Sequence, residues 1–344
     1  MSEKLISFCI PSYNSENYMR KCIESILPGG EDVEIIIVND GSKDKTGEIA
    51  DEYAAKYPTI CRAVHQENGG HGEGVNQGIR LGKGLYLKIV DSDDWVNEEA
   101  LLTLIAKIKE HKAAGTLPEL YITNFVYEHV EDNTTYVRSY KKNFKENVIA
   151  TWKEMKPFHY SSTLLMHSLM YRLDVLRSSG LVLPKHTFYV DNLYAHNPLP
   201  YVKNYYYMDL NFYRYFIGRS DQSVNWDVFA KRTDQQNRVM LGMATAFHLY
   251  DIKKTDKHLF KYLKHNLAAL MSVTYAFTYA KITKEKKQAL KQLLKDIKAF
   301  DPKVYRFLKY RSYVCVCTYL GDWIGRKLVI YGYKRLNKKL KFST

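Results

Sequence analysis

The stretch Leu85-Tyr-Leu-Lys-Ile-Val-Asp-Ser-Asp-Asp-Trp95 ends an apolar run with three carboxylates in four residues. Residues 85–90 have the length and composition of a buried strand. Asp91, Asp93 and Asp94 follow so closely that they repel one another, and at least one is costly to keep ionised without a positive partner. The alternative is a polar turn with a helix cap, since aspartate is common in both. Taken alone, the stretch leaves both interpretations open.

On either side of this stretch, apolar runs of strand length alternate with segments of helical spacing. Further strands are expected at residues 5–10, 33–38 and 61–64, and helices at 16–27, 46–57, 72–81 and 97–111. This alternation predicts an α/β fold with a doubly wound, mostly parallel sheet. Right-handed crossovers then place ligands at the carboxyl ends of the strands.

The second half of the chain has a looser pattern. A β-hairpin is expected from 121–130 and 135–140, followed by a stretch rich in proline and aromatic residues over 183–219. Helical spacing then prevails, with helices expected at 226–250, 257–281, 284–300 and 313–340. The length and the change of pattern predict two domains, an α/β domain over residues 1–224 and a helical region over residues 225–344.

Charge is unevenly spread along the 344 residues, whose net charge is +14. Residues 1–100 carry ten basic and eighteen acidic side chains, whereas residues 301–344 carry eleven basic and two acidic ones. An acidic first domain argues against a grip on nucleic acid phosphates, so no nucleic acid partner is expected. After residue 305, bases interleave with aromatic residues, which suits a helix lying on an anionic membrane surface. The alternative is a basic helix packed on its own domain.

The sequence predicts neither a signal peptide nor a membrane span. The chain begins Met-Ser-Glu-Lys, and its longest stretch without charged residues or histidine, 266–280, falls short of the ~20 residues that a span needs. The five cysteines, at positions 9, 22, 61, 315 and 317, lack the spacing of zinc sites. These features predict a cytoplasmic protein with reduced thiols, at the inner face of the cell membrane if the terminal region binds lipid.

A polar cluster follows each of the first four predicted strands. The clusters are Pro11-Ser-Tyr-Asn14, Asn39-Asp-Gly-Ser-Lys-Asp44, Glu67-Asn-Gly-Gly-His-Gly72 and Asp91-Ser-Asp-Asp94. Because the carboxyl ends of parallel strands lie along one edge of a sheet, the four clusters are expected to form one ligand site. This convergence favours the ligand interpretation of the acidic turn over the cap interpretation.

The order and spacing of these clusters resemble the inverting family 2 glycosyltransferases of the GT-A fold. The resemblance is carried by residues 10–14, 38–44, 68–72 with 76–78, and 90–95, and it continues through 183–192 and 215–224. It leaves the helical region uncovered. It implies an enzyme that moves a sugar from a nucleotide sugar, with a UDP-sugar favoured, to a hydroxyl of a cell-surface glycan or lipid-linked acceptor.

In enzymes of this kind the aspartates after the fourth strand hold a divalent cation against the donor. A nucleotide diphosphate brings about two negative charges to a turn already lined with carboxylates, which is unfavourable unless a cation bridges them. Hard oxygen ligands favour Mg²⁺ or Mn²⁺. By resemblance Asp93 is expected to be the direct metal ligand. Asp91 is a second ligand, or it meets the ribose or a metal-bound water, and Asp94 alternatively caps the next helix.

The resemblance implies that Asp40 accepts the uracil N3–H while Pro11 and Tyr13 pack on the base. The alternatives are a plain turn at 40–41 and a tyrosine in the core. Further donor contacts are implied for Asn68, Gly69, Gly70, His71, Asn76, Asp91, Ser92, Arg219, Gln222 and Ser223. Many members of the family have arginine at the position of Val75, so His71 or Arg219 is expected to supply that charge. The alternatives are an ordinary surface histidine at His71 and a hinge or salt-bridge role for Arg219.

The reaction also requires one carboxylate in the acceptor cleft, which takes a proton from the attacking hydroxyl. By resemblance this base is Asp191, although Val190 stands where related enzymes usually have Glu. A turn cap is the alternative role for Asp191, and Asp174 is the next candidate base.

Two other classes of protein compete with the interpretation as a glycosyltransferase. A sugar nucleotidyltransferase needs a Gly-rich basic loop that residues 11–15 lack, and a non-catalytic GT-A-like binding module would keep the fold alone.

Overall fold

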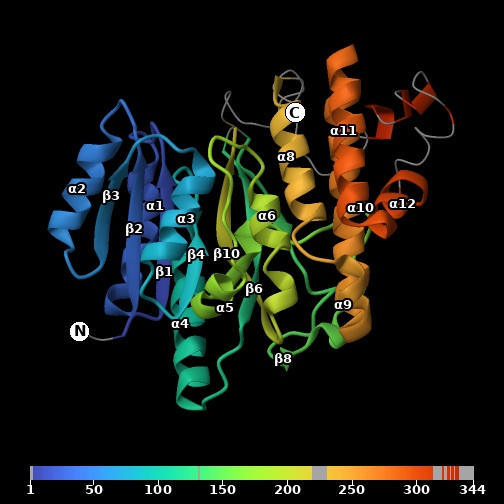
Figure 1. Ribbon diagram of the computed structural model, residues 1–344. Helices are drawn as coiled ribbons and strands as arrows, with labels where there is room; N and C mark the ends of the chain where they lie inside the picture. Colours follow the sequence, from blue (N-terminus) through green and yellow to red (C-terminus); the bar gives the residue numbers. More distant parts are fainter. Residues whose placement is uncertain are drawn as a thin grey trace. The chain divides into compact units, whose positions relative to one another are not determined.

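A computed structural model describes residues 3–130, 132–218 and 231–312, with residues 320, 324–325, 327–328 and 330–332 beyond them. The chain divides into two compact units, Met1–Lys156 with Leu164–Arg219 and Pro157–Thr163 with Ser220–Thr344. The first unit contains the sheet, and the second is helical (Figure 1). The predicted boundary at residue 224 lies outside the described residues, so the division into 1–224 and 225–344 stays a prediction.

The first unit is built on a ten-stranded sheet whose main path runs β3-β2-β1-β4-β9-β6-β10-β5 (Figure 1). The strands are β1 (Ile6–Ser12), β2 (Val33–Asp40), β3 (Cys61–Gln66), β4 (Tyr86–Ile89), β5 (Trp95–Val96), β6 (Leu120–His129), β7 (Thr134–Arg138), β8 (Ile149–Ala150), β9 (Leu169–Arg172) and β10 (Tyr205–Ile217). Strands β1 to β4 are mutually parallel, and β10 is parallel to β6. The antiparallel β9 lies between β4 and β6. The predicted mostly parallel α/β sheet is confirmed.

Helices cover both faces of this sheet, which is why β1 is buried along its whole length and reads as a continuous apolar run. The helices are α1 (Met19–Ile26), α2 (Thr46–Lys56), α3 (His71–Leu81), α4 (Glu98–Ala113), α5 (Leu173–Ser178) and α6 (Asp191–His196). Glycines let α3 lie very close to β1. A Cβ atom at Gly78 would stand 2.6 Å from the Cβ of Cys9, and one at Gly74 would stand 2.8 Å from the Cβ of Pro11. The amino end of α3 is thereby held at the carboxyl end of β1.

The sequence pattern predicted β1 to β4 and the β6–β7 hairpin, but it missed β9 and β10. β9 has four residues and is a strand only because it pairs with β4 and β6. β10 lies in the stretch rich in proline and aromatic residues, and its register with β6 shifts between Tyr207 and Tyr213. Its tyrosines are buried in succession rather than alternately, so the period of two that marks a half-buried strand is absent.

The second unit consists of helices α8 (Thr233–Ala244), α9 (Leu249–Thr255), α10 (Lys257–Ala280), α11 (Lys284–Phe300) and α12 (Pro302–Tyr310). The helices expected at 257–281 and 284–300 are confirmed. The single helix expected at 226–250 is wrong, because α8 ends at Ala244 and α9 is a separate helix. Its first residues, 226–230, lie outside the described residues, as does most of the helix expected at 313–340. Among the described residues, no helix has the length and apolarity that crossing a bilayer requires.

Helix α12 was not predicted, although its start carries a recognisable signal. Asp301 precedes Pro302, and its Oδ1 accepts hydrogen bonds from the main-chain N–H groups of Lys303 at 2.8 Å and Val304 at 3.2 Å. An aspartate cap followed by proline at the first helical position is a typical helix start. The helix therefore begins as soon as α11 has ended.

Candidate active site

The acidic turn after β4 is held in place by β10. The hydroxyl of Tyr213 donates a hydrogen bond to Asp94 Oδ2 at 2.5 Å, and the hydroxyl oxygen of Tyr213 accepts one from the main-chain N–H of Asp91 at 3.1 Å. The N–H of Phe216 donates to Asp94 Oδ1 at 2.8 Å. Burial beside two other aspartates raises the pKa of Asp94 well above its ordinary range. Asp94 therefore fastens the turn to the sheet.

The alternative role of Asp94, as cap of the next helix, is wrong. Asn97 caps α4, since its Oδ1 accepts a hydrogen bond from the main-chain N–H of Ala100 at 2.9 Å. The carboxylate of Asp94 is occupied by β10 instead.

Asp91 interacts with two histidines. Its Oδ1 lies 2.7 Å from His71 Nε2, and its Oδ2 lies 3.7 Å from His167 Nε2. Burial would raise the pKa of Asp91, but the two imidazoles lower it far below the ordinary range. In return, Asp91 raises the pKa of His71 against the opposing effect of burial. Asp91 thus stays ionised, with a histidine partner at hydrogen-bond distance.

His167 is a residue that sequence reasoning missed. It lies in a short 3₁₀ turn ahead of β9, and its ring packs edge-on to Tyr213 and Tyr215, with 4.8 Å between ring centroids in each case. It is buried, and neither ring nitrogen has a hydrogen-bond partner among the described residues. Its neighbours in the sequence, Met166 and Ser168, carry no motif. Only the insertion of β9 beside β4 brings this imidazole to Asp91.

Asp91, Asp94 and His167 form a group that could hold a metal ion, since each offers one ligand atom and these atoms lie within 4.8 Å of one another. Two carboxylates and a buried imidazole without a hydrogen-bond partner suit a divalent cation with mixed oxygen and nitrogen ligands. A cation here would also offset the burial and the repulsion between carboxylates that together raise the pKa of Asp94. Asp93, the expected direct ligand, is not a member of this group, and its role stays a prediction.

A buried lysine supports the turn that carries His167. Lys88 Nζ donates to the carbonyl oxygen of His167, and to that of Leu169 at 3.2 Å. Burial lowers the pKa of Lys88 to about 7. Because both acceptors belong to the segment that enters β9, Lys88 fixes the main chain on which the imidazole of His167 is mounted.

Asp40, at the end of β2, is almost fully buried and fastens the loop between β3 and α3. Its Oδ1 accepts from the N–H of Gly69 at 2.7 Å and from Gln66 Nε2 at 2.6 Å, and its Oδ2 accepts from the N–H of Gly70 at 2.8 Å. A carboxylate oxygen can accept two hydrogen bonds, so Oδ2 keeps one direction for a further donor. Asp40 thus holds the loop in place and retains the capacity to accept one N–H from a ligand.

The loop that Asp40 holds makes a close approach to the end of β2. Gly41 has φ 69°, and a Cβ atom there would lie 2.8 Å from the main-chain nitrogen of Asn68. Asn68 Nδ2 donates to the carbonyl oxygen of Asp40 at 2.9 Å. The residue at position 41 therefore needs both the backbone freedom and the small volume of glycine.

Three other predicted donor residues lie at the ends of β1 and β4. Tyr13 is 50% exposed, so the alternative that it belongs to the core is wrong. Pro11 is buried against Gly74 of α3. Ser92 is buried, and its hydroxyl lies 2.7 Å from that of Ser15 in a side-chain hydrogen bond.

The predicted donor residue Asn76 is engaged by the chain that precedes α6. Its Nδ2 donates to the carbonyl oxygen of Leu183, and its Oδ1 accepts from the N–H of the same residue, both at 2.9 Å. Val75 is fully buried, so the family's arginine would have no room at that position. The predicted residues Arg219, Gln222 and Ser223 lie outside the described residues. Of His71 and Arg219, the two candidates to replace the positive charge of the family's arginine, the structure therefore describes His71 alone.

Asp191 is the first residue of α6, and Val190 rather than Asp191 occupies the N-cap position. Burial raises the pKa of Asp191, while the charges of His167 and His71 oppose the rise and that of Asp91 adds to it. A Cβ atom at Gly72 would stand 3.5 Å from Cγ2 of Val190, so the start of α6 lies close to the start of α3, which carries His71. Two regions more than 90 residues apart in the sequence thus supply acidic groups to one site.

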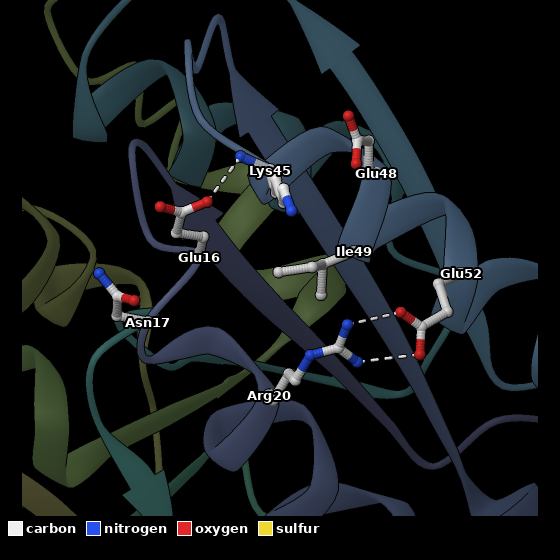
Figure 2. A pocket seen from close by; sticks show the side chains of 7 residues that line it. All are labelled: Glu16, Asn17, Arg20, Lys45, Glu48, Ile49 and Glu52. Carbon is white, nitrogen blue, oxygen red and sulfur yellow. Dashed lines mark hydrogen bonds and ion pairs between the residues drawn. The ribbon is translucent and has the colours of Figure 1, made fainter.

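A hollow of about 290 Å³ lies near α1 and α2. Figure 2 shows the side chains that line it. The guanidinium of Arg20 pairs with both oxygens of Glu52, at 2.9 and 2.6 Å, and Glu16 accepts from the main-chain N–H of Lys45 at 3.0 Å. The lining is Glu16, Asn17, Arg20, Lys45, Glu48, Ile49 and Glu52. Its three carboxylates outnumber its two cations, which disfavours a diphosphate, so this hollow is not part of the candidate site.

Comparison with known sequences identifies relatives for the first half of the chain. Residues 7–172 match the model of Glycosyl transferase family 2. "Glycosyltransferase GlyA" of Streptococcus pneumoniae is 36% identical over 159 residues, which cover 44% of this chain and 23% of that protein. "Putative glycosyltransferase EpsH" of Bacillus subtilis is 32% identical over 189 residues, which cover 54% of this chain and 52% of that protein. The chain therefore spans about a quarter to a half of the length of these curated relatives.

Solved structures share the fold. Staphylococcus aureus TarS 1–349 in complex with UDP-GlcNAc superposes with a TM-score of 0.66 at 18% identity, covering 96% of this chain and 92% of that one. The mannosyltransferase PcManGT from Pyrobaculum calidifontis, in complex with GDP-Man and Mn²⁺, gives a TM-score of 0.50 at 14% identity, covering 96% and 88%. These likenesses confirm the predicted GT-A fold. The sequence match over residues 7–172 assigns this part of the chain to glycosyl transferase family 2.

Proposed function

We propose that this protein transfers a sugar from a nucleotide sugar, with a UDP-sugar favoured, to a hydroxyl of a cell-surface glycan or lipid-linked acceptor. The observation that carries the proposal is the contact of Asp91 with two histidines at the carboxyl edge of the sheet, where the start of α6, with Asp191, approaches the start of α3. A nucleotide-sugar transferase needs both a diphosphate site and a base at one place. The family match supports the reaction class, and the likeness to TarS bound to UDP-GlcNAc supports the donor class.

On the donor side, the base would lie against the exposed ring of Tyr13, with its N3–H toward the remaining acceptor direction of Asp40 Oδ2. Asp91, Asp94 and His167 would hold Mn²⁺ or Mg²⁺, with Asp93 as the further ligand that the resemblance implies. When bound, such a cation neutralises charge on the departing nucleoside diphosphate. His71, whose pKa is raised by Asp91 despite burial, would add positive charge near the phosphates.

On the acceptor side, Asp191 would remove the proton from the acceptor hydroxyl. A raised pKa makes its carboxylate a stronger base than a solvated aspartate, which favours this proton transfer. The acceptor oxygen forms a bond to the anomeric carbon as the bond from that carbon to the phosphate oxygen breaks. The electron pair leaves with the diphosphate, the proton stays on Asp191, and a single displacement inverts the anomeric configuration.

The proposal places the protein in the reducing cytoplasm. Cys9, Cys22 and Cys61 are buried free thiols, as expected where disulfides do not form. Burial also raises the pKa of Cys9 to about 12, so this thiol is unreactive. The expected membrane contact of the C-terminal region rests largely on residues outside the described ones and remains a proposal.

The reaction is tested by incubating the protein with a panel of UDP-sugars, with and without Mn²⁺, and measuring the release of UDP. We expect release from one donor, and its loss when a chelator removes the metal. Formation of pyrophosphate from a nucleoside triphosphate and a sugar 1-phosphate would instead assign the rival nucleotidyltransferase reaction. Binding of a UDP-sugar without release of UDP, even with glycan acceptors present, would favour the binding module.

A further inference from the structure

The helical unit carries an excess of positive charge that its own carboxylates cannot neutralise. Residues 231–312 contain nineteen Lys and Arg but six Asp and Glu, a balance of +13. Some of these carboxylates form ion pairs, as Asp251 does with Lys254 at 2.7 Å. Six carboxylates are nevertheless too few to neutralise nineteen cations, so the segment keeps an excess of positive charge. Such a concentration of one sign of charge attracts anionic partners.

Four of these cations form a straight row on α11. The lysine row consists of Lys284, Lys291, Lys295 and Lys298, all exposed. At 100° per residue their side chains fall within an arc of about 60°, and with 1.5 Å of rise per residue they extend over about 21 Å. The buried residues of the helix, Leu290, Leu293 and Ile297, lie on the opposite face. The row therefore points into solvent along the whole helix.

The acidic residues of α11 lie away from the lysine row. Glu285 and Asp296 are rotated from its centre by roughly 100° or more. Asp296 accepts a hydrogen bond from Gln292 Nε2 at 2.6 Å, and a hydrogen bond from Thr283 lowers the pKa of Glu285. Both carboxylates thus have partners of their own, and the row keeps its charge.

We propose that the lysine row binds a linear anionic polymer with repeating phosphate groups. A line of positive charges at intervals of one to two helical turns matches a line of negative charges, and the flexible lysine stems tolerate differences in spacing. Among its described residues, α11 has no exposed large apolar side chain, so it lacks the face that a membrane-inserting helix needs. It also exposes no aromatic ring on which nucleic acid bases could stack. The inference concerns binding alone and does not depend on the proposed transferase activity.

The test measures the binding of long-chain inorganic polyphosphate to the full-length protein over a range of salt concentrations. The variant Lys284→Gln/Lys291→Gln/Lys295→Gln removes three charges of the row and keeps good helix formers. Its matched control, Lys142→Gln/Lys145→Gln/Lys153→Gln, removes three exposed charges from the first unit. We expect the row variant to bind polyphosphate about tenfold more weakly than the native protein. In a plot of log K against log salt concentration, the magnitude of its slope should be smaller by about 2, because three contacts are lost and each contact to a single-stranded polyanion contributes roughly 0.7. The control should bind as the native protein does.

Equal loss of affinity in both variants would overturn the proposal, because net charge rather than the row would then govern binding. A parallel arm measures flotation with phosphatidylglycerol vesicles. If the row variant loses flotation while its polyphosphate binding equals that of the native protein, the row is a membrane contact and the polymer proposal fails. Thermal unfolding of both variants, expected to match the native protein, excludes misfolding as the cause of any loss.

Discussion

The hydroxyl of Tyr213 lies 2.5 Å from Asp94 Oδ2 and joins β10 to a turn that precedes it by 119 residues. The same hydroxyl oxygen accepts the main-chain N–H of Asp91, so one side chain fixes both ends of the acidic turn. The candidate metal ligands Asp91 and Asp94 therefore keep their spacing through a residue of a strand that the sequence did not predict.

Replacing this hydroxyl should lower the free energy of unfolding of the protein and weaken its metal site. Tyr213→Phe removes a donor to Asp94 and an acceptor for the Asp91 N–H at a fully buried position, which should cost about 1–3 kcal/mol in free energy of unfolding. Tyr136→Phe, at a tyrosine that is 37% exposed, should change it by less than about 0.5 kcal/mol. Urea unfolding measures both changes. Equal stability of the two variants would show that this hydrogen bond does not hold the turn.

The geometry and the family resemblance give different metal ligands, and two variants separate them. We expect His167→Gln to weaken Mn²⁺ binding by about tenfold or more, since loss of even a supporting group in a metal site costs 10–100-fold. Asp93→Asn should have a smaller effect, because Asp93 is not in the group whose ligand atoms converge. Calorimetric titration with Mn²⁺ in the presence of UDP gives both affinities. The reverse order would restore Asp93 as the direct ligand and leave His167 a packing residue.

The base is tested by a change that keeps its shape. Asp191→Asn should lower transfer by about 10²-fold or more while the affinity for the donor stays the same, because an amide cannot take the proton. Asp174→Asn is the matched control. Its carboxylate is largely exposed and hydrogen-bonded to Arg172 at 2.7 Å, so transfer should be unchanged. Near-normal transfer by the Asp191 variant, measured with donor and acceptor at saturation, would move the base elsewhere.

Two glutamines should tune nucleotide binding through Asp40. Gln77 Nε2 donates to Gln66 Oε1 at 2.8 Å, and Gln66 Nε2 donates to Asp40 Oδ1 at 2.6 Å, so the amides orient the carboxylate. Gln66→Leu removes one hydrogen bond to a charged group and should weaken UDP binding by about tenfold, and Gln77→Leu should have a smaller effect. Fluorescence titration with UDP measures both. If Gln66→Leu binds UDP as the native protein does, Asp40 is positioned by the glycine N–H groups alone.

His196 should make the protein sensitive to acid. Burial lowers its pKa from 6.5 to about 3, so between these values the unfolded chain binds a proton that the folded protein excludes. Its contribution to stability is therefore complete above pH 6.5 and is lost as the pH falls toward 3, at up to ~1.4 kcal/mol per pH unit. His196→Phe should flatten the pH dependence of urea unfolding between pH 4 and 6, and His258→Gln, at an exposed histidine, should not. An unchanged slope in His196→Phe would assign the acid sensitivity to other groups.

Much of the donor side of this protein follows from local sequence. The alternation of strands and helices over the first hundred residues predicted the parallel sheet, because each of those strands is a short apolar run that ends in a polar cluster. Since parallel strands end at one edge, that pattern also placed Asp40 and Asp91 at the same edge. The family resemblance added Asp191, which no local rule would single out.

Tertiary structure alone decided how the acidic turn is completed. His167 reaches Asp91 because β9 enters the sheet between β4 and β6, and Asp94 meets Tyr213 because β10 pairs with β6. Neither strand has a periodicity of its own. β9 is too short to show one, and the tyrosines of β10 are buried in succession. Strand pairing between distant segments is stabilised by partners that a local window does not contain, so the residues those strands carry into the site could be found only in the folded chain.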